Sequence, residues 1–324
     1  MMMYGDATRK GRPFAKDPAV VRFADHYWLY YSMPPFGAGP THNSWDGRLA
    51  WQPNWGWGIG IARSDDLENW DKLGEILPSA AYEENGICAP GALVLDGSLH
   101  LFYQTYGNGP RDAICHAVSD DGLHFSRNPT NPVFAPNGEW TCGRAIDADV
   151  IRDGERVLLY FATRDPTMTT QMLGVAAAPL EGAETSPVSR FRRSAWTQLG
   201  EGPILRPELP WEQECVEAPA VCKYGDRFFM FYGGAYNNGP QQIGCAESYD
   251  GLHWQRLSRE PFLPNGTPGS WNACESGHPY VFIDTADDGA TYLFYQGNND
   301  LGRTWYLSQR RIDWAGGYPY LVEA

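Results

Sequence analysis

The sequence predicts an all-β fold, a five-bladed β-propeller with four antiparallel strands in each blade. Three observations lead to this prediction: a composition rich in turn-forming and aromatic residues, a hairpin pattern that recurs five times, and a second strand unit that follows the hairpin. Glycine and proline number 36 and 25 of the 324 residues, and 14% of the chain is aromatic. Because an ordinary chain holds only about 12% glycine and proline together, this chain needs many turns and is not expected to form long helices.

The hairpin pattern consists of a small or polar residue, usually followed by proline, then an apolar stretch, a turn and an aromatic-rich strand. Its copies start 58 to 72 residues apart, at Asp17, Ala89, Asp147, Ala218 and His278. The second strands, such as YWLYYS at 27–32 and VLLYFA at 157–162, are almost continuously apolar. Such strands are typical of sheets that are covered on both faces, as stacked blades are.

A second repeated unit occupies residues 58–70, 113–125 and 243–254. Each copy has a strand of small residues, a Ser-x-Asp turn and an aromatic residue that starts another strand. We assign Asp65, Asp121 and Asp250 to turns and not to a ligand site, because aspartate readily bonds its own backbone. Five four-stranded units around one axis form a propeller, and two adjacent β-sandwiches fit the repeat spacing less well. We expect a single domain over residues 1–324 without a linker.

Composition excludes several classes of partner. The chain has 25 basic and 39 acidic side chains and a formal charge of −14, which argues against nucleic acid, because phosphate binding needs clustered lysine and arginine. No apolar run approaches the length of about 18 residues that a membrane span needs. No signal peptide is recognisable, so we expect a cytoplasmic protein, or a secreted or periplasmic one whose signal has been removed. The oligomeric state is not indicated.

Acidic side chains gather where the repeats start. The innermost strands of a propeller begin at one rim of the central channel, so aligned positions converge there. Asp17, Asp147 and Glu217 come from three repeats and His278 from a fourth. Separated carboxyl groups are what hydrolysis of a glycosidic bond needs, since one activates water and another protonates the leaving oxygen.

Five short motifs at the repeat starts resemble those of glycoside hydrolase family 43 and, more broadly, of the clan that also holds the family 32 fructosidases. The resemblance spans roughly residues 14–314. The motifs are Lys16-Asp17-Pro18, Cys88-Ala89-Pro90, Ile146-Asp147-Ala148, Glu217-Ala218-Pro219 and Gly277-His278. The resemblance implies that Asp17 is the general base, that Glu217 is the general acid, and that Asp147 tunes the pKa of the acid and orients the substrate. It also implies inversion of the anomeric carbon and hydrolysis without a required cofactor. His278 would help to hold an axial water or metal ion, often calcium.

The resemblance further implies an exo-acting enzyme on terminal pentoses of plant-type oligosaccharides, an α-L-arabinofuranosidase or a β-D-xylosidase. Cys88, Gly91, Ala148 and Ala220 depart from the family motifs at the pocket rim, which weakens the substrate assignment. Three alternatives stay open. One is a related glycosidase on anhydrogalactose, galactofuranose or fructosyl groups with a histidine acid such as His42. Another is a phosphorylase, which needs a basic cluster that the sequence does not show, and the last is a non-catalytic carbohydrate-binding propeller.

Candidate substrate-binding residues lie around these motifs. A tryptophan-rich insertion at 34–57 offers flat surfaces for sugar rings, although its tryptophans could equally pack the loop or a subunit contact. The candidates are Trp45, Trp57, Arg144, Tyr236 and Arg303, with Asn237 and Asn238 as further hydroxyl-binding residues. Asp149 is the alternative to Asp147, which we prefer because it aligns with Asp17 in the repeat.

Overall fold

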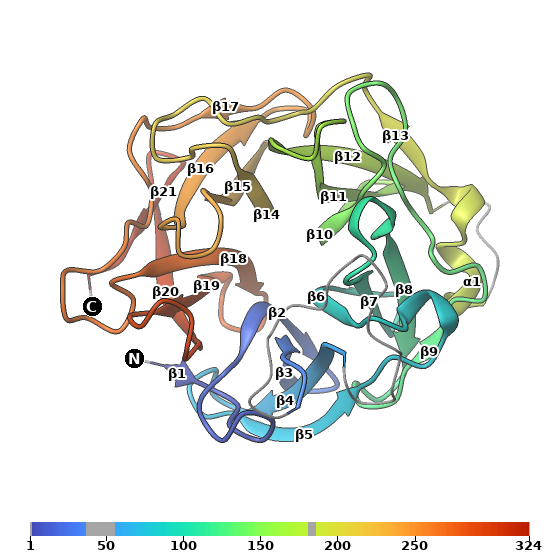
Figure 1. Ribbon diagram of the computed structural model, residues 1–324, viewed down its shortest axis with the longest axis horizontal. Coiled ribbons are helices and arrows are strands. Elements are labelled where there is room, and N and C mark those ends of the chain that lie inside the picture. The colour runs from blue at the N-terminus through green and yellow to red at the C-terminus, as the bar shows by residue number, and fades with distance from the viewer. Residues whose placement is uncertain (1, 37–55, 181–185, 324) are drawn as a thin grey trace.

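The computed structural model describes residues 2–36, 56–180 and 186–323. Its strands form five antiparallel sheets arranged in a ring, with the first strand of each sheet nearest the central axis (Figure 1). Each innermost strand packs against the innermost strands of the two neighbouring blades. The prediction of an all-β, five-bladed propeller is therefore confirmed.

Four of the blades have the predicted four strands in chain order, from the axis outward. Blades one and two consist of β2 (Lys16–Phe23), β3 (His26–Met33), β4 (Gly58–Ser64), β5 (Asp71–Ile76), and β6 (Ile87–Leu95), β7 (Ser98–Thr105), β8 (Ile114–Ser119), β9 (Ser126–Arg127). Blades three and four consist of β10 (Ile146–Asp153), β11 (Arg156–Arg164), β12 (Gln171–Pro179), β13 (Thr197–Leu199), and β14 (Val216–Tyr224), β15 (Arg227–Gly234), β16 (Gln242–Ser248), β17 (Gln255–Arg256).

The fifth blade joins both ends of the chain. Its inner strands are β18 (Glu275–Asp284), β19 (Ala290–Asn298) and β20 (Tyr306–Ala315). The outer edge of β20 pairs with β21 (Tyr318–Leu321) and also with the N-terminal strand β1 (Met3–Tyr4). The ring is thus closed by a segment that precedes blade one, a feature that the repeat pattern does not contain.

Helical structure is minor. The described residues include one four-residue helix, α1 (Pro187–Arg190), and 3-10 turns at Ala81–Glu83, Gly109–Arg111 and Arg193–Ala195. None of the helices in the described part of the chain is long and apolar enough to cross a membrane.

The five repeat starts share one backbone conformation. Each lies at a β-bulge, where the register between the innermost strand and its neighbour shifts. The φ angles there are all positive: 52° at Asp17, 46° at Ala89, 53° at Asp147, 50° at Ala218 and 43° at His278. Positive φ is uncommon outside glycine, and bulges re-aim side chains beside functional sites. The repeat alignment therefore identifies one structural position in every blade.

Side chains from the preceding blade accept the backbone N–H groups of four of these five residues. The pairs are Asp17 with Gln296 Oε1 (3.0 Å), Ala89 with Ser32 Oγ (2.8 Å), Asp147 with Gln104 Oε1 (2.7 Å) and His278 with Gln241 Oε1 (2.9 Å). A buried amide needs such a partner, so each bulge is fixed to its neighbouring blade and the side chain that it aims is held in place.

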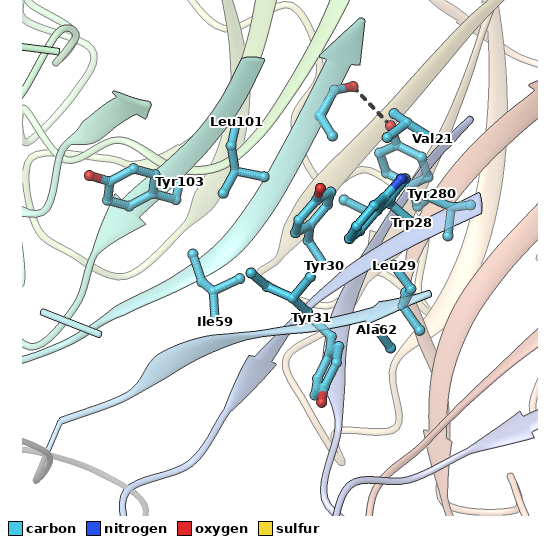
Figure 2. Close-up of a cluster of buried hydrophobic side chains, with 14 of the residues drawn as sticks. Val21, Trp28, Leu29, Tyr30, Tyr31, Ile59, Ala62, Leu101, Tyr103 and Tyr280 are labelled. Atoms are coloured by element: carbon cyan, nitrogen blue, oxygen red, sulfur yellow. Dashed lines mark hydrogen bonds between the residues drawn. The ribbon is translucent and has the colours of Figure 1, made fainter. Parts of the chain in front are cut away.

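Aromatic side chains fill the space between blades. Figure 2 shows Tyr30 of β3 and Tyr103 of β7 in the apolar cluster between blades one and two, where both are fully buried. Their hydroxyl groups are satisfied, because Tyr30 donates to Gly122 O at 2.8 Å and Tyr103 donates to the Glu83 carboxylate at 2.7 Å. The hydroxyl of Tyr280 in blade five donates to Ala92 O of blade two at 3.1 Å (Figure 2). The bonds of Tyr30 and Tyr280 connect different blades, and that of Tyr103 fixes the segment that leads into blade two.

The Ser-x-Asp units form turns, as predicted, with one correction. In blades two and four, Asp121 and Asp250 accept two backbone N–H bonds each from the residues that follow them. The equivalent residue in blade one is Asp66 and not Asp65, because Asp66 Oδ1 accepts the N–H groups at positions 68 and 69. Asp65 instead contacts His26 Nδ1 at 2.7 Å. The error arose because two aspartates follow each other in this copy.

Candidate active site

A cavity of about 270 Å³ lies at the rim where the innermost strands begin. It receives all four side chains that the repeat alignment brings together: Asp17 of β2, Asp147 of β10, Glu217 of β14 and His278 of β18. The carboxyl groups are buried, with the three residues only 6 to 8% exposed. Burial of three acids in one cavity is costly without compensation, so their partners decide the chemistry.

Asp17 is held in its ionised form. Its Oδ1 lies 3.2 Å from His278 Nδ1 and 3.9 Å from Lys16 Nζ. Burial alone would raise the pKa of Asp17, but the nearby His278 and Lys16 outweigh it and hold that pKa below its usual range. A buried carboxylate that stays ionised can accept a proton from water.

Asp147 behaves in the opposite way. Its pKa is raised to about 7, chiefly by burial and also by the neighbouring carboxylates Glu217 and Asp17, although His278 and Arg144 act against this. Like charges in one site cannot all ionise easily. The cluster of three carboxyl groups therefore retains a proton up to about neutral pH.

Two glutamine side chains clamp Glu217. Gln171 Nε2 donates to Glu217 Oε2, and Gln241 Nε2 donates to Glu217 Oε1 at 2.6 Å. The orientation of Gln241 is fixed, because its Nε2 also donates to Ala235 O and its Oε1 accepts the His278 N–H. Glu217 is thus locked to the bulge of the next blade. Sequence reasoning missed both glutamines, although each stands two residues before an apolar-Gly step of the third strand, Leu173-Gly174 or Ile243-Gly244. This shared position is the signal that could have identified them.

Arginine side chains line the cavity beside Glu217. Arg164 Nε donates to Gln171 Oε1 at 3.0 Å, and Arg144 Nη1 reaches the same oxygen at 3.4 Å. Together with Lys16 and His278 they give the cavity four basic side chains. The sequence showed no basic cluster at the pocket, and the structure corrects this, because the four residues come from separate positions in blades one, three and five.

A second polar network lies behind Lys16. Lys16 Nζ donates to Asn237 Oδ1 at 3.2 Å, and the same oxygen accepts Gln296 Nε2 at 2.9 Å. Gln296 Nε2 also donates to Glu275 Oε1 at 2.8 Å. Burial raises the pKa of Glu275 to about 7, with Lys16 acting in the opposite direction. This network fixes the Lys16 ammonium group beside Asp17.

The other predicted residues are only partly brought together. Trp57, Tyr236 and Arg144 line the cavity, as does Asn237. Arg303 lies in the loop after β19, is exposed and is not among the residues that line the cavity. Asn238 also lies outside; its side chain accepts a bond from Asn298 at 3.0 Å. Trp45, Trp51, Trp55 and His42 lie outside the described residues.

Asp149 does not share the cavity with Asp147. Its Oδ2 accepts the N–H of Val221 on β14 at 2.7 Å, so it lies between blades three and four. The bulge between Ile146 and Asp149 puts an extra residue into the strand, so the two aspartates face different ways although they are only two residues apart. The structure therefore favours Asp147 as the cavity residue.

The described residues contain no group of three or more histidine, cysteine, aspartate or glutamate side chains that could hold a metal ion. His278, the predicted metal-linked residue, instead contacts Asp17 through Nδ1. Direct protein ligands for an axial calcium are therefore not assembled in this part of the chain, and calcium held through water stays a prediction.

Five blades around one axis, with carboxyl groups of three blades in a single cavity, define the propeller class of glycosidases. The chain belongs to glycosyl hydrolases family 43, whose family model matches residues 11–319. It is therefore a glycoside hydrolase, and its substrate is a carbohydrate.

Relatives and solved structures are consistent with this family. The uncharacterized protein Rv1502 of Mycobacterium tuberculosis is 26% identical over 265 residues, which cover 73% of this chain and 81% of the relative. A thermostable family-43 glycoside hydrolase matches with a TM-score of 0.72 at 18% identity, over 99% of this chain and 96% of that one. The α-L-arabinofuranosidase of Lactobacillus brevis matches with a TM-score of 0.68 at 16% identity, over 98% and 95%. At these identities the structural matches show the fold alone.

Proposed function

We propose that this glycoside hydrolase is an inverting exo-enzyme that removes terminal pentoses, α-L-arabinofuranosyl or β-D-xylosyl groups. The observation that carries the proposal is the single cavity in which Asp17 is kept ionised while the carboxyl cluster retains a proton. A base and an acid with separated pKa values are the pair that glycoside hydrolysis needs. The pentose assignment follows from the resemblance of the repeat-start motifs, and an α-L-arabinofuranosidase is among the solved structures that share this fold.

The reaction is one displacement. Asp17 accepts a proton from a water molecule, the water oxygen attacks the anomeric carbon, and the bond to the leaving oxygen breaks as Glu217 protonates that oxygen. Asp17 and Glu217 come from blades one and four, which are not neighbours in the ring, and this separation supports a mechanism with water between them. Asp147 keeps a proton in the cluster, and His278 and Lys16 keep Asp17 ionised.

Cavity size supports an exo mode of action. The cavity of about 270 Å³ lies below the range of about 300–1,000 Å³ that holds drug-sized ligands. One terminal sugar suits such a volume better than an internal stretch of a polysaccharide.

The test is a screen of 4-nitrophenyl glycosides, including α-L-arabinofuranoside and β-D-xyloside, with NMR of the first product anomer. We expect release of the inverted sugar, and we expect Asp17→Asn and Glu217→Gln to lower kcat/KM by about 10²–10⁴-fold, the usual contribution of an acid or base. Asp226→Asn, an exposed carboxylate in the β14–β15 turn, is the matched control. Losses below tenfold in both cavity variants, or a retained anomer, contradict the proposal.

Phosphorolysis is the second candidate, because the cavity has four basic side chains that a phosphate nucleophile could contact. Turnover assayed with and without inorganic phosphate decides between the two. Hydrolysis requires a rate that does not depend on phosphate and a free sugar as product.

A further inference from the structure

Among the described residues that line the cavity, Arg164 is the one cation without an acidic partner. Lys16 and His278 lie beside Asp17, and Arg144 Nε lies 3.4 Å from the buried Asp112 carboxylate. Among the described residues no carboxylate lies within 4.0 Å of Arg164. The chain has a formal charge of −14, so a guanidinium without an acidic partner in the active-site cavity indicates a role in binding an anionic ligand.

The guanidinium of Arg164 is held in one orientation by neutral groups. Nε donates to Gln171 Oε1 at 3.0 Å, and Nη1 reaches Met168 O at 3.5 Å. Its Cζ lies 5.1 Å from the ring centre of Tyr236, whose hydroxyl is itself anchored on Thr169 O at 3.0 Å. Of five N–H donors, three have no acceptor in the described part of the chain. A fixed guanidinium with free donors is suited to bind a carboxylate with two parallel hydrogen bonds.

The position of Arg164 indicates which part of the substrate carries the charge. Gln171 joins Arg164 to Glu217, since its oxygen accepts from the arginine and its nitrogen donates to the carboxyl group. Glu217 is the residue that would protonate the leaving oxygen. The charges that act on Asp17, the residue on the water side, are His278 and Lys16 and do not include Arg164.

We propose that the substrate is an acidic oligosaccharide, in which a uronate carboxylate on the leaving-group side of the scissile bond binds Arg164. This rests on the proposed function, because that function defines the leaving-group side. A phosphate nucleophile would have to approach opposite the leaving oxygen, on the side of Asp17, so the position of Arg164 favours a substrate carboxylate over free phosphate.

The first test measures binding and needs no turnover. Calorimetry compares di- and trigalacturonate with their methyl esters, which keep the sugar rings and lose the charge. We expect the acids to bind at least about tenfold more tightly, Arg164→Gln to remove this preference, and Arg164→Lys to keep part of it, because lysine retains the charge without the planar fork. Arg152→Gln, an exposed arginine of the same blade, should keep the full preference. Unfolding temperatures establish that each variant is folded.

The second test measures turnover with the sugar that the glycoside screen identifies, linked to 4-carboxyphenol or to its methyl ester. We expect a higher kcat/KM for the acid, a preference that falls with rising salt and that Arg164→Gln abolishes. Equal values for acid and ester in both tests overturn the proposal, and so does an acid preference that Arg164→Gln leaves intact. Competition by millimolar inorganic phosphate together with phosphate-dependent turnover assigns Arg164 to phosphate and also overturns it.

The two proposals fail separately. Hydrolysis of neutral aryl glycosides without any acid preference leaves the proposed function standing and removes the acidic substrate. Binding of galacturonates through Arg164 without turnover of any glycoside removes the proposed function and leaves the preference of the cavity for a uronate carboxylate.

Discussion

The carboxyl groups of Asp17 and Asp147 lie in one cavity and hold protons very differently. The pKa of Asp17 is held low by His278 and Lys16, while that of Asp147 is raised to about 7 by burial and by its acidic neighbours. We expect kcat/KM to fall as pH rises through about 7, because the cluster then loses the proton that the leaving group needs.

The same cluster predicts the effect of removing one acid. Asp147→Asn takes away a like charge, so the remaining acid should lose its proton more easily, and the alkaline limb should move down by about one pH unit or more. The measurement is the pH profile of kcat/KM for both proteins on one aryl glycoside. An alkaline limb that does not move would show that Asp147 does not tune the acid.

Asp149 gives a matched comparison outside the cavity. Burial raises its pKa to about 7, although the N–H groups of Val221 and Val150 lower it. Because this folded-state value lies above the usual one, the protonated form favours folding, and that contribution is complete below about pH 4 and is lost as pH rises through 7. Asp149→Asn should therefore be more stable than the wild type at pH 8 by about 2–4 kcal/mol, and equally stable near pH 4.

Denaturant unfolding at the two pH values checks this prediction. Activity is the second readout: kcat/KM of Asp149→Asn should stay within a few-fold of wild type, because its side chain bonds β14 and does not line the cavity. A loss beyond tenfold would return Asp149 to the catalytic candidates.

At the scale of elements, the turns that end the third strands also dock the blades. The Gly122 carbonyl accepts the Tyr30 hydroxyl of blade one, and a Cβ on Gly122 would lie 2.6 Å from Trp28 Cε2. Gly97, in the β6–β7 turn, has nearly the same φ, 81° against 79°, but open space around it.

Alanine at the two glycines separates strain from packing. Gly97→Ala should cost about 1–2 kcal/mol for the left-handed backbone alone, and Gly122→Ala should cost about 1–3 kcal/mol more, because the blade contact is overpacked. Unfolding free energies from denaturant titration provide the comparison. Equal costs at the two positions would mean that the turn does not dock on blade one.

Elements differ in how well the sequence predicts them. The innermost strands and the positions where they start were predictable, because Asp17, Asp147 and His278 occupy a position that repeats with every blade. The residues that act on these acids, Gln171 and Arg164, were not. Arg164 ends β11 and Gln171 begins β12, so the two residues are paired across this hairpin, and only the folded chain brings them beside Glu217.

At the scale of the whole molecule, the sequence predicts the number of blades but not how the ring closes. The fourth strand of blade five, β21, pairs only with the end of β20, and β1 from the other end of the chain pairs with its beginning. A two-residue strand has no detectable pattern. Its pairing with β20 depends on a circular arrangement that only five stacked sheets create.

Closure by β1 should stabilise the contact between blades five and one, where His278 meets Asp17. Met2 is 2% exposed and its carbonyl accepts the Ser308 hydroxyl at 2.6 Å, while the Tyr4 hydroxyl donates to Tyr31 of blade one at 2.9 Å. Burial of one such side chain contributes about 1.5–3 kcal/mol, and each hydrogen bond adds about 0.5–1.5 kcal/mol. Removal of residues 1–4 should therefore lower the unfolding free energy by about 3 kcal/mol or more.

Tyr4→Phe is the control for this deletion, because it keeps the strand and loses one hydroxyl, at a cost of about 1 kcal/mol. Calorimetric unfolding of the three proteins gives the comparison, and kcat/KM below the melting temperature gives a second readout. If closure maintains the His278–Asp17 contact, the deletion should also reduce activity, whereas Tyr4→Phe should not. A deletion no more destabilising than Tyr4→Phe would mean that the ring holds together through the contacts of its innermost strands alone.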